Sequence, residues 1–552
     1  MTRRLSRRAA SATVRAVQPK LPRVSPVTLL IAAVAVMAAI PAWVVDHPPV
    51  MDWPFHLATI RVVADFGDPA FGFADHFTLT LWRTQYVLFY LLGAVLSAVV
   101  GVHAAMMTLV SGYLAGTVLG MAALLRALGR DPRVALLVAP VLPNVLFYYG
   151  LFPFLIGVPL VLFGLAVALR HFDAVTSGEM AGRRGWIRAV GLGVLALALF
   201  FTHAFPFLIF GLGFAALFPW RFPRRWLLAG GPVVPSLVAA VIWAVGTEAG
   251  QLSLGALTDG GSGQRLALDA ALADIPHWLM DALASTRDDA LFLAFLGLVF
   301  LASTLAQGAG PAVAAEGGPT PDGLVRPASP WRLRLHALLP LACAVLYFRS
   351  PQGNGYLWLI AQRFPMLFVI TALPLLRFPG GRAGHVVTAL AALLALLTTW
   401  STVAAFRAFE RDDVGDFDAA AAQLPPRAKV AALIFDKGSS TTNGRFAPFL
   451  HFGSYVQADH GGVVMFSYAG YAHWPFDFAP GKAPPGGSPA RLRWEWTPER
   501  VSARDELAPY YTHVLVRGDR FRPADAPFQR VYDGARWDVW ENTALKAAGA
   551  AP

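Results

Sequence analysis

Twelve separate apolar runs divide this chain, and they constrain its fold more than any other feature of the sequence. Each run has about 14 to 22 residues with few charges, and a helix needs roughly 20 apolar residues to cross the hydrocarbon core of a bilayer. The runs lie at 27–45, 84–102, 104–125, 134–150, 152–170, 189–203, 205–219, 226–246, 289–306, 335–348, 364–378 and 384–405. This pattern predicts an all-α polytopic membrane protein.

The composition agrees with a membrane location. Charged residues make up 14% of the chain, against about 25% in soluble globular proteins. The single cysteine, Cys343, lies inside an apolar run, which excludes a disulfide framework and a thiolate metal cluster. The net charge is +11, but residues 407–552 hold 17 Lys and Arg against 17 Asp and Glu. The positive excess therefore belongs to the membrane part, where it sets orientation, and it predicts no nucleic-acid partner.

The distribution of Lys and Arg also predicts the topology. The run 27–45 follows a basic N-terminus and shows no small-residue cleavage site, so we expect an uncleaved first helix rather than a signal peptide. If every run crossed, the basic loops 126–133 and 170–188 would lie on the wrong side. Treating 83–101 as a juxtamembrane or half-inserted outer helix removes this conflict. About eleven crossings then place 22 Lys and Arg on inner segments and six on the outer segments before 407.

The chain is predicted to have three parts. Residues 1–26 form a basic cytoplasmic N-terminus, and 27–406 form the transmembrane domain, with its first outer loop at 47–103 and a disordered cytoplasmic linker at 308–330. Residues 407–552 form a small extracytoplasmic domain of α/β or mainly β type. Three of its segments, RAKVAALIFD, THVLVRGD and RWDVWE, have the apolar content and turn residues of short strands.

Asp52 and His56 form the leading candidate site, at the outer end of the first helix. Their i, i+4 spacing places them on one helix face. A carboxylate at this low-dielectric boundary suits a general base or a ligand for a divalent cation, and His56 suits a proton-sharing partner. Asp52 before Trp53-Pro54 is also a good helix N-cap. The sequence leaves capping and chemistry equally open.

Asp75 and His76 lie in the same loop and, with Asp52, are the weak candidates for a metal site. No CxxC, HExxH or DxD spacing accompanies them within that loop. A solvated surface loop is the more common role for such a pair. A divalent cation is the one cofactor that the sequence leaves open.

Four further polar residues are predicted near the outer helix ends. Arg363 and Arg83 lie on the face that orientation rules deplete of cations, and a guanidinium suits a lipid phosphate. Contact with ordinary lipid headgroups is the alternative for both. His203, inside an apolar hairpin, and Asn144 are weaker candidates for the same phosphate, because buried polar groups at membrane depth usually face a cavity or a partner.

The layout resembles the GT-C superfamily of integral membrane glycosyltransferases and its uncharacterised bacterial relatives. The similar segments are DWPFH at 52–56, YVLFYLL at 86–92, LLRALGRDPRVALL at 124–137, YYGLFPFLIGVPLVLFGLAVALR at 148–170 and AQRFP at 361–365, with YYTHVLVRGD and RWDVWE in the tail. The resemblance implies a polyprenyl-phosphate-linked sugar donor, a lipid or glycan acceptor, surrounding membrane lipids, and Asp52 as catalytic base or metal ligand.

The resulting prediction is a glycosyltransferase of the bacterial inner membrane that acts on its outer side. Asp52 and His56 are the predicted catalytic residues, and Arg363 with Arg83 are predicted to bind the donor phosphate. A lipid or polysaccharide transporter, or flippase, is the first alternative, and it predicts titratable groups at mid-bilayer and matching halves. A non-catalytic membrane assembly protein of the same fold is the second.

Overall fold

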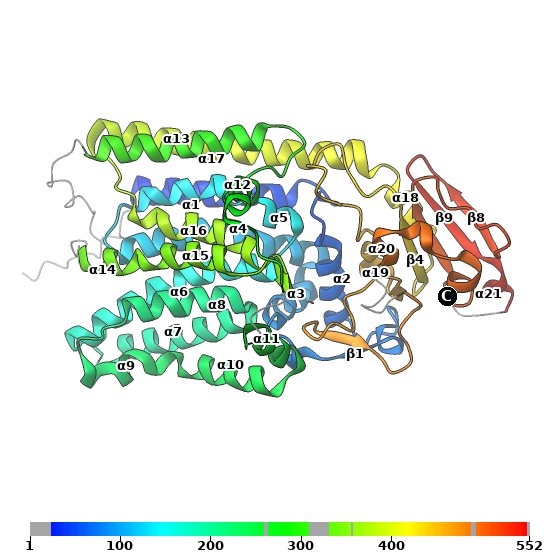
Figure 1. The fold of residues 1–552 in the computed structure, drawn as a ribbon, viewed down its shortest axis with the longest axis horizontal. Helices are drawn as coiled ribbons and strands as arrows, with labels where there is room; N and C mark the ends of the chain where they lie inside the picture. The colour runs from blue at the N-terminus through cyan, green and yellow to red at the C-terminus, as the bar shows by residue number, and fades with distance from the viewer. Residues whose placement is uncertain are drawn as a thin grey trace, which may run out of the picture.

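Long apolar helices lie side by side along the long axis of the molecule (Figure 1). The computed structural model describes residues 24–180, 182–258, 263–307, 330–354, 357–486 and 493–548. Within them, eight helical segments are long and apolar enough to cross a membrane. They are Pro26–Trp43 (beginning with α1, Pro26–Ala39), Val102–Ala127 (α4), Phe152–Ser177 (α6), Arg183–Thr202 (α7), Pro223–Gly246 (with α9, Trp226–Gly230, and α10, Val234–Gly246), Arg287–Ala306 (within α13, Arg287–Gln307), Pro330–Arg349 (α14, Pro330–His336, and α15, Leu338–Arg349) and Gly381–Val414 (beginning with α17, Gly381–Ala408). The all-α membrane bundle predicted from the sequence is confirmed.

Four shorter apolar segments accompany these helices. They are α3 (Val87–Val100), the 3-10 segment η4 (Pro132–Val141), α8 (Ala204–Leu217) and the segment Ala361–Leu375, which contains α16 (Phe364–Ala372). The remaining helices of the membrane part are α2 (Trp53–Ala64), α5 (Val145–Tyr149), α11 (Glu248–Thr258) and α12 (Leu268–Leu279). In Figure 1, α12 is seen end-on while the membrane helices run across the page, so α12 lies across the bundle. That the chain crosses the membrane eleven times stays a prediction.

Both ends of α3 meet the C-terminal domain. Arg83, just before the helix, places its Nη1 2.9 Å from an oxygen of Asp477. The chain turns at Gly101, whose φ of 81° places it in the left-handed region, and α4 then begins. His103, in the first turn of α4, lies 2.7 Å from Asp459. The helix thus enters and leaves on one side of the bundle, as a half-inserted helix does.

A line of glycines allows α4 and α6 to pack closely. Gly116 and Gly120 are four residues apart and therefore lie on one face of α4. A Cβ at Gly116 would lie 3.2 Å from Pro159 of α6, and one at Gly120 would lie 3.1 Å from Leu162. Small residues at such a seam let two membrane helices approach each other, which supplies packing energy where lipid offers no hydrophobic drive. This pair fixes the position of the chain just before α6, where the candidate site lies.

The C-terminal domain is an α/β domain around a five-stranded sheet with the order β5-β4-β7-β9-β8. Its strands are β4 (Lys429–Ile434), β5 (Val463–Val464), β7 (His513–Arg517), β8 (Phe528–Asp533) and β9 (Trp537–Asn542). β4 pairs in parallel with β5 and β7, while β9 pairs antiparallel with β7 and β8. The three strands predicted from the sequence are β4, β7 and β9, and all three are confirmed. The helices of the domain are α18 (Phe417–Ala421), α19 (Gly453–His460), α20 (Arg493–Trp496) and α21 (Thr543–Ala547).

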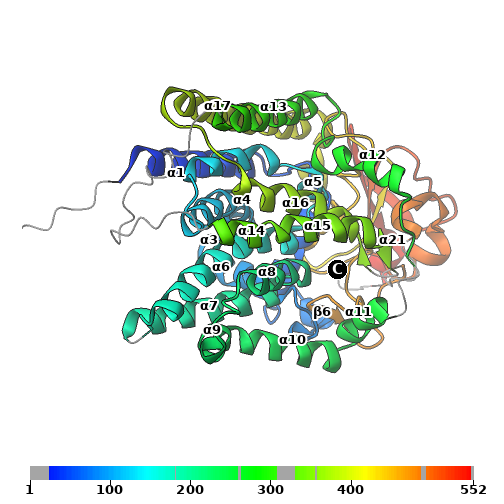
Figure 2. The ribbon, with the colours of Figure 1, turned by 60° about the vertical axis from the view of Figure 1, so that its left-hand side comes forward.

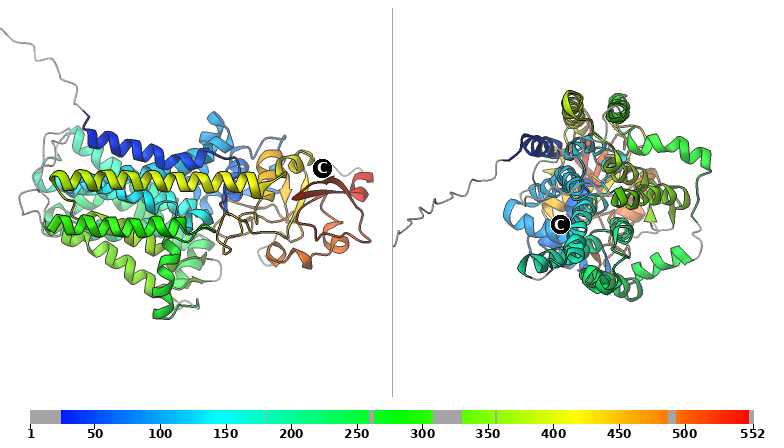
Figure 3. Two further views of the ribbon diagram at one scale, coloured as in Figure 1. Left: turned by 90° about the horizontal axis from the view of Figure 1, so that it is seen from above. Right: turned by 90° about the vertical axis from the view of Figure 1, so that its left-hand side faces the viewer.

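This domain lies at one end of the bundle and holds the first loop (Figures 1 and 2). Strand β1 (Phe77–Leu79) of that loop pairs antiparallel with β6 (Phe476–Phe478) of the domain. Helix α19 packs along α2. Seen from above, α17 continues from the bundle toward the domain (Figure 3). A π-helical turn extends this helix to Val414, seven residues after residue 407, where the C-terminal domain was predicted to begin. The short pair β2 (Gly353–Asn354) and β3 (Leu357–Trp358) precedes α16.

Two predicted segments lie largely outside the described residues. They are the basic N-terminus, of which residues 1–23 are not described, and the cytoplasmic linker, of which 308–329 are not described.

Candidate active site

Asp52 precedes α2, and backbone contacts fix its position. The N–H groups of Met51 and Asp52 donate to the carbonyl oxygens of Tyr148 and Tyr149, at 2.9 and 3.2 Å. Gly150, with φ 86°, ends α5 against Asp52, where an added Cβ would lie 2.9 Å from the Asp52 Cβ. The first outer loop and the α5–α6 turn are therefore held together at this point.

The Asp52 side chain does not cap α2. Asp52 occupies the N-cap position, with Pro54 in the first turn, but its carboxylate accepts no hydrogen bond from the helix. Instead its Oδ1 lies 3.0 Å from Nδ1 of His451, and Nε2 of His451 lies 2.5 Å from Oε1 of Glu495. The approach angles depart from hydrogen-bond geometry, so these contacts are ion pairs. Of the two roles left open for Asp52, side-chain capping is excluded.

The three side chains form a buried carboxylate–imidazole–carboxylate series. The side chains of Asp52, His451 and Glu495 are 13%, 3% and 5% exposed. Burial alone favours a neutral ring, but Glu495 and Asp52 outweigh it and raise the pKa of His451 to about 9. Burial raises the pKa of Glu495, while the neighbouring His451 opposes that rise. At neutral pH His451 is therefore an imidazolium ion between two acids.

His56 faces away from this series despite its i, i+4 spacing from Asp52. Its Nε2–H donates to the Gly150 carbonyl at 2.8 Å, and its Nδ1 accepts from the Tyr90 hydroxyl at 3.0 Å. Burial lowers the pKa of His56 to about 4. A neutral ring with both nitrogens occupied has no proton to share with Asp52. His56 positions the Gly150 turn, which in turn presses against Asp52.

Arg363 forms a second cluster with His203. Its Nε and Nη2 donate to the carbonyl oxygens of Leu359 and Trp358, at 2.8 and 3.2 Å, and its Nη1 lies 2.6 Å from Nε2 of His203. The guanidinium also lies over the rings of Phe154 and Phe205, at 5.3 and 5.0 Å from their centroids. Arg363 is buried. No carboxylate of the described residues pairs with it, so the arginine carries an uncompensated positive charge.

The contact between Arg363 and His203 brings two donors together. His203 caps α8, because its Nδ1 accepts from the Phe205 N–H at 3.1 Å. A neutral imidazole that accepts at Nδ1 carries its proton on Nε2, and Nε2 faces a guanidinium N–H. An anion bound beside the two groups would accept from both.

Tyr86 stacks on the His203 ring at 4.8 Å, and His473 meets Tyr86 edge-on. Burial, Arg363 and Arg83 lower the pKa of His473 to about 4.

Both clusters border the α5–α6 turn. Tyr149 and Gly150 contact Asp52 and His56 through backbone atoms, and Phe154 lies beneath Arg363. Tyr149 also meets the ring of Trp358, the residue that accepts from Arg363. A nearby crevice between η4, α13 and α17 reaches Tyr148 and Asp288 but is lined by neither Asp52 nor Arg363. The candidate site therefore lies at the turn, and the crevice is separate from it.

Two of the predicted phosphate-binding residues have structural roles. Arg83 is paired with Asp477 at 2.9 Å and lies 4.0 Å from Glu248. Asn144 is the N-cap of α5, since its side-chain oxygen accepts from the Leu146 and Phe147 N–H groups. The charge of Arg83 is thus paired within the protein, and the amide of Asn144 is used by the backbone. Arg363 and His203, which were both predicted to bind the donor phosphate, lie in contact with each other.

The weak metal candidates are not brought together either. Asp75 lies 2.7 Å from Arg427 on the surface, where it forms an ion pair. His76, the next residue, packs against Phe77. Within the described part of the chain, no group of three His, Cys, Asp or Glu side chains has the arrangement of a metal site. The set of Asp52, Asp75 and His76 is therefore no single site.

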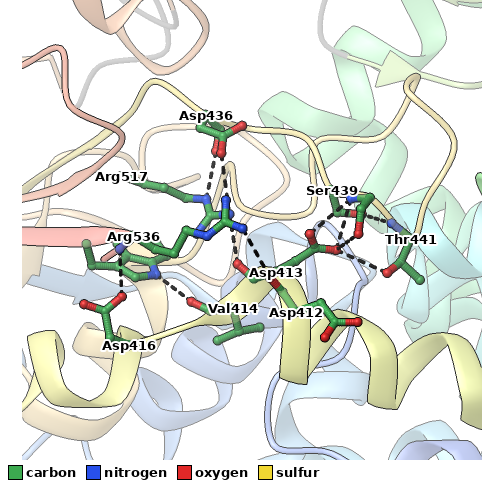
Figure 4. A network of polar contacts seen from close by, with 11 residues as sticks. Asp412, Asp413, Val414, Asp416, Asp436, Ser439, Thr441, Arg517 and Arg536 are labelled. Carbon is green, nitrogen blue, oxygen red and sulfur yellow. Dashed lines mark hydrogen bonds and ion pairs between the residues drawn. The ribbon is translucent and has the colours of Figure 1, made fainter. Parts of the chain in front are cut away.

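A polar network fixes the loop that carries His451 (Figure 4). Arg517 donates to the carbonyl oxygens of Asp436 and Asp413 at 3.0 and 2.9 Å, and its guanidinium lies 3.5 Å from the centroid of Phe449. The Asp413 carboxylate accepts from Ser440 and Thr441. The end of α17 thus holds the segment 436–449 from both sides. His451 follows directly and is placed against α2.

His451 and Glu495 were not predicted from the sequence. They lie about 400 and 440 residues after Asp52 in the chain, and neither belongs to a recognisable motif. A signal was present in their neighbours: His451 stands in FLHF and Glu495 in RWEW. A titratable residue within a buried aromatic segment requires a partner, and each of these residues supplies the other's.

Comparison with known proteins identifies the fold. No family model and no curated protein matches the chain. The crystal structure of ArnT from Cupriavidus metallidurans in the apo state is similar, with a TM-score of 0.50 and 12% identity, over 95% of this chain and 99% of that one. The cryo-EM structure of the arabinofuranosyltransferase AftD from Mycobacteria has a TM-score of 0.43 and 14% identity, over 93% of this chain and 40% of that one. At this identity the likeness to ArnT, a GT-C glycosyltransferase, shows the fold alone: the chain has the GT-C fold.

Proposed function

We propose that this protein is a membrane glycosyltransferase that moves a sugar from a polyprenyl-phosphate donor to an acceptor hydroxyl on the outer side of the bacterial inner membrane. One observation carries the proposal most directly. Arg363 is a buried cation without a carboxylate partner among the described residues, and it lies across a single turn from the buried acid Asp52. A site with a base on one side and a buried cation without a carboxylate partner on the other suits transfer from a phosphate leaving group.

The geometry supports a direct displacement at the sugar. Among the described residues Asp52 Oδ2 forms no hydrogen bond, while Oδ1 is engaged with His451. The acceptor hydroxyl gives its proton to Oδ2 while its oxygen forms the bond to the anomeric carbon. The bond from that carbon to the phosphate oxygen breaks, and the electron pair leaves with the polyprenyl phosphate. Arg363 and the Nε2–H of His203 stabilise the charge that develops there.

The distribution of charge supports the proposed orientation. Arg130 and Arg133 follow α4 at the end of the bundle opposite the C-terminal domain, and Arg183, Arg184 and Arg225 flank other helices at that end. Lys and Arg favour the cytoplasmic side of bacterial membranes. We therefore propose that this end lies in the cytoplasm with the N-terminus, and that the C-terminal domain and the candidate site lie outside.

The test is transfer or hydrolysis measured with a panel of synthetic polyprenyl-phosphate pentoses and hexoses, on purified protein in lipid nanodiscs. Asp52→Asn keeps the size of the side chain but removes the base, and we expect a loss on the order of 10² to 10⁴ in rate. Arg363→Lys is expected to weaken donor use, because a fork of donors becomes a point charge.

Two matched variants serve as controls. Asp75→Asn removes an acid of the same outer loop that pairs with Arg427 on the surface. Arg83→Lys changes an outer arginine that is already paired with Asp477. Both should retain transfer. If the wild type releases polyprenyl phosphate from none of these donors, the proposed function is wrong. If Asp52→Asn matches an active wild type, the role of Asp52 as base is wrong.

A further inference from the structure

His451 and Glu495 belong to the C-terminal domain, whereas Asp52 belongs to the first loop of the membrane domain. His451 lies just before α19, which packs along α2, and Glu495 lies in α20. The proposed transfer uses neither residue as a base or an anion site. Yet both ring nitrogens of His451 face a carboxylate oxygen, at 3.0 and 2.5 Å.

Burying these three ionisable side chains together costs free energy unless every charge has a partner. A low-dielectric site disfavours a lone charged carboxylate. An imidazolium ion beside it removes that penalty. One imidazolium can satisfy two carboxylates only when both of its nitrogens carry protons. Glu495 thus acts on Asp52 through His451, by keeping the ring protonated.

Among the described residues, two charged groups act on His451. They are Asp52 and Glu495, with the neutral His56 beyond Asp52. Phe55 lies 4.0 Å from the ring, centroid to centroid, and Phe466 stacks on it at 5.4 Å with an interplanar angle of 6°. Tyr468 meets the ring edge-on at 6.2 Å, and burial raises the pKa of its hydroxyl. Lys437 faces Glu495 and favours its ionised form. With Phe466 stacked on the imidazole, both ring nitrogens still face an acid.

We propose that His451 and Glu495 are positioning residues of the transfer site, and that the C-terminal domain thereby holds the Oδ1 of Asp52 and directs its Oδ2 at the acceptor. This inference rests on the proposed role of Asp52 as the base. It predicts that the membrane domain alone holds an incomplete site. It also gives the docking of α19 on α2 a catalytic consequence, since any separation of the two helices would leave Asp52 without its counterion.

The first test needs no substrate. Protein labelled with ¹⁵N-histidine is studied in nanodiscs by NMR, with His451→Gln assigning the signal. In the wild type we expect doubly protonated His451 up to about pH 9. Glu495→Gln and Asp52→Asn should each lower its titration midpoint by at least about one unit, because each removes a facing negative charge. The Asp75→Asn control should leave the midpoint unchanged. A midpoint near 6.5 in the wild type, or one that Glu495→Gln does not move, would overturn the proposal.

The second test is the pH profile of transfer by His451→Gln, which keeps an amide donor of similar size. The wild-type His451 loses its proton as the pH rises through about 9, so the wild-type kcat should fall along a basic limb there that His451→Gln lacks. Activity at neutral pH should fall at least about tenfold, with KM for the donor unchanged. A loss that is uniform over the whole pH range would mean a merely structural role and would contradict the proposal.

The two tests separate this inference from the proposed function. If Asp52→Asn retains transfer while the NMR midpoints shift as expected, the ion series exists but the proposed base is wrong. If Asp52→Asn abolishes transfer while Glu495→Gln moves neither the midpoint nor the basic limb, the base stands and the role of the C-terminal domain is refuted. Should His451→Gln fail to accumulate, Glu495→Gln carries both tests, because it leaves His451 in place.

Discussion

Replacing Asp52 by asparagine distinguishes a helix cap from an ion pair through stability alone. If Asp52 were only a cap, Asn would serve almost equally well and the cost would be a few tenths of a kcal/mol. The structure shows no capping bond and places the carboxylate 3.0 Å from His451. Removing one partner of a fully buried ion pair costs about 3–5 kcal/mol when the other is left uncompensated. Glu495 still compensates His451, so we expect about 1–3 kcal/mol, with each unit of lost pKa shift contributing about 1.4 kcal/mol.

The sign of the pH dependence follows from the raised pKa of His451. Its folded-state pKa of about 9 lies above the ordinary value of 6.5. The stabilisation is therefore fully present below about pH 6.5 and is lost as the pH rises through about 9. Wild type and Asp52→Asn should differ most near pH 6 and least near pH 10, where the wild-type ring is neutral as well.

The assay is thermal unfolding of the purified protein in one detergent, followed by tryptophan fluorescence at pH 6 and pH 10. Membrane proteins seldom unfold in two states, so only differences in Tm at one scan rate are compared. We expect Asp52→Asn to unfold several degrees below the wild type at pH 6, with the gap narrowing at pH 10. Asp75→Asn should match the wild type at both. An Asp52→Asn protein as stable as the wild type at pH 6, or a gap of equal size at both pH values, would refute the ion-pair reasoning.

Two further variants test the geometry. Gly150→Ala should lower the rate of transfer about 10- to 100-fold, because φ is 86° and the new Cβ would lie 2.9 Å from the Asp52 Cβ. The control Gly381→Ala, with φ 55° and open space around it, should not lower the rate. Equal losses in the two variants would contradict the importance of the contact between Gly150 and Asp52. In a Cys343→Ser background, single cysteines at Trp82 and His103 should both react with an impermeant maleimide from outside the cell, while one at Arg183 should react only after permeabilisation. Reaction of Trp82 and His103 positions from opposite sides would mean that α3 crosses.

Local signals in the sequence were enough for the bundle and the strands. Apolar runs of membrane length became helices because a bilayer leaves the backbone no other way to satisfy its hydrogen bonds. β4 and β7 followed from short apolar segments between turn residues, because strands buried on both faces need such segments. β9 followed from the alternation of apolar and polar residues in RWDVWE. The half-inserted position of α3 was predicted from the distribution of charge over several loops, and it stays a prediction.

Only those site residues that stand out from their own sequence neighbours were predicted. Asp52, Arg363 and His203 stood out because each is polar at an apolar helix end. The roles of His56 and Asn144 were not predictable, since both depend on which backbone groups the α5–α6 turn leaves free: His56 donates to Gly150, and Asn144 caps α5. The partners of Arg83 and Asp75, Asp477 and Arg427, lie more than 350 residues away in the chain. Spacing within one loop carries no information about such contacts.

Asp52 is balanced by a histidine, whose two ring nitrogens can face two carboxylates at once. Histidine is neutral in an unfolded chain near pH 7. It becomes a cation only after folding brings Glu495 and Asp52 to its two nitrogens, which raise its pKa to about 9. The counterion of the proposed base is thus formed by the docking of the C-terminal domain itself, after the membrane helices are in place.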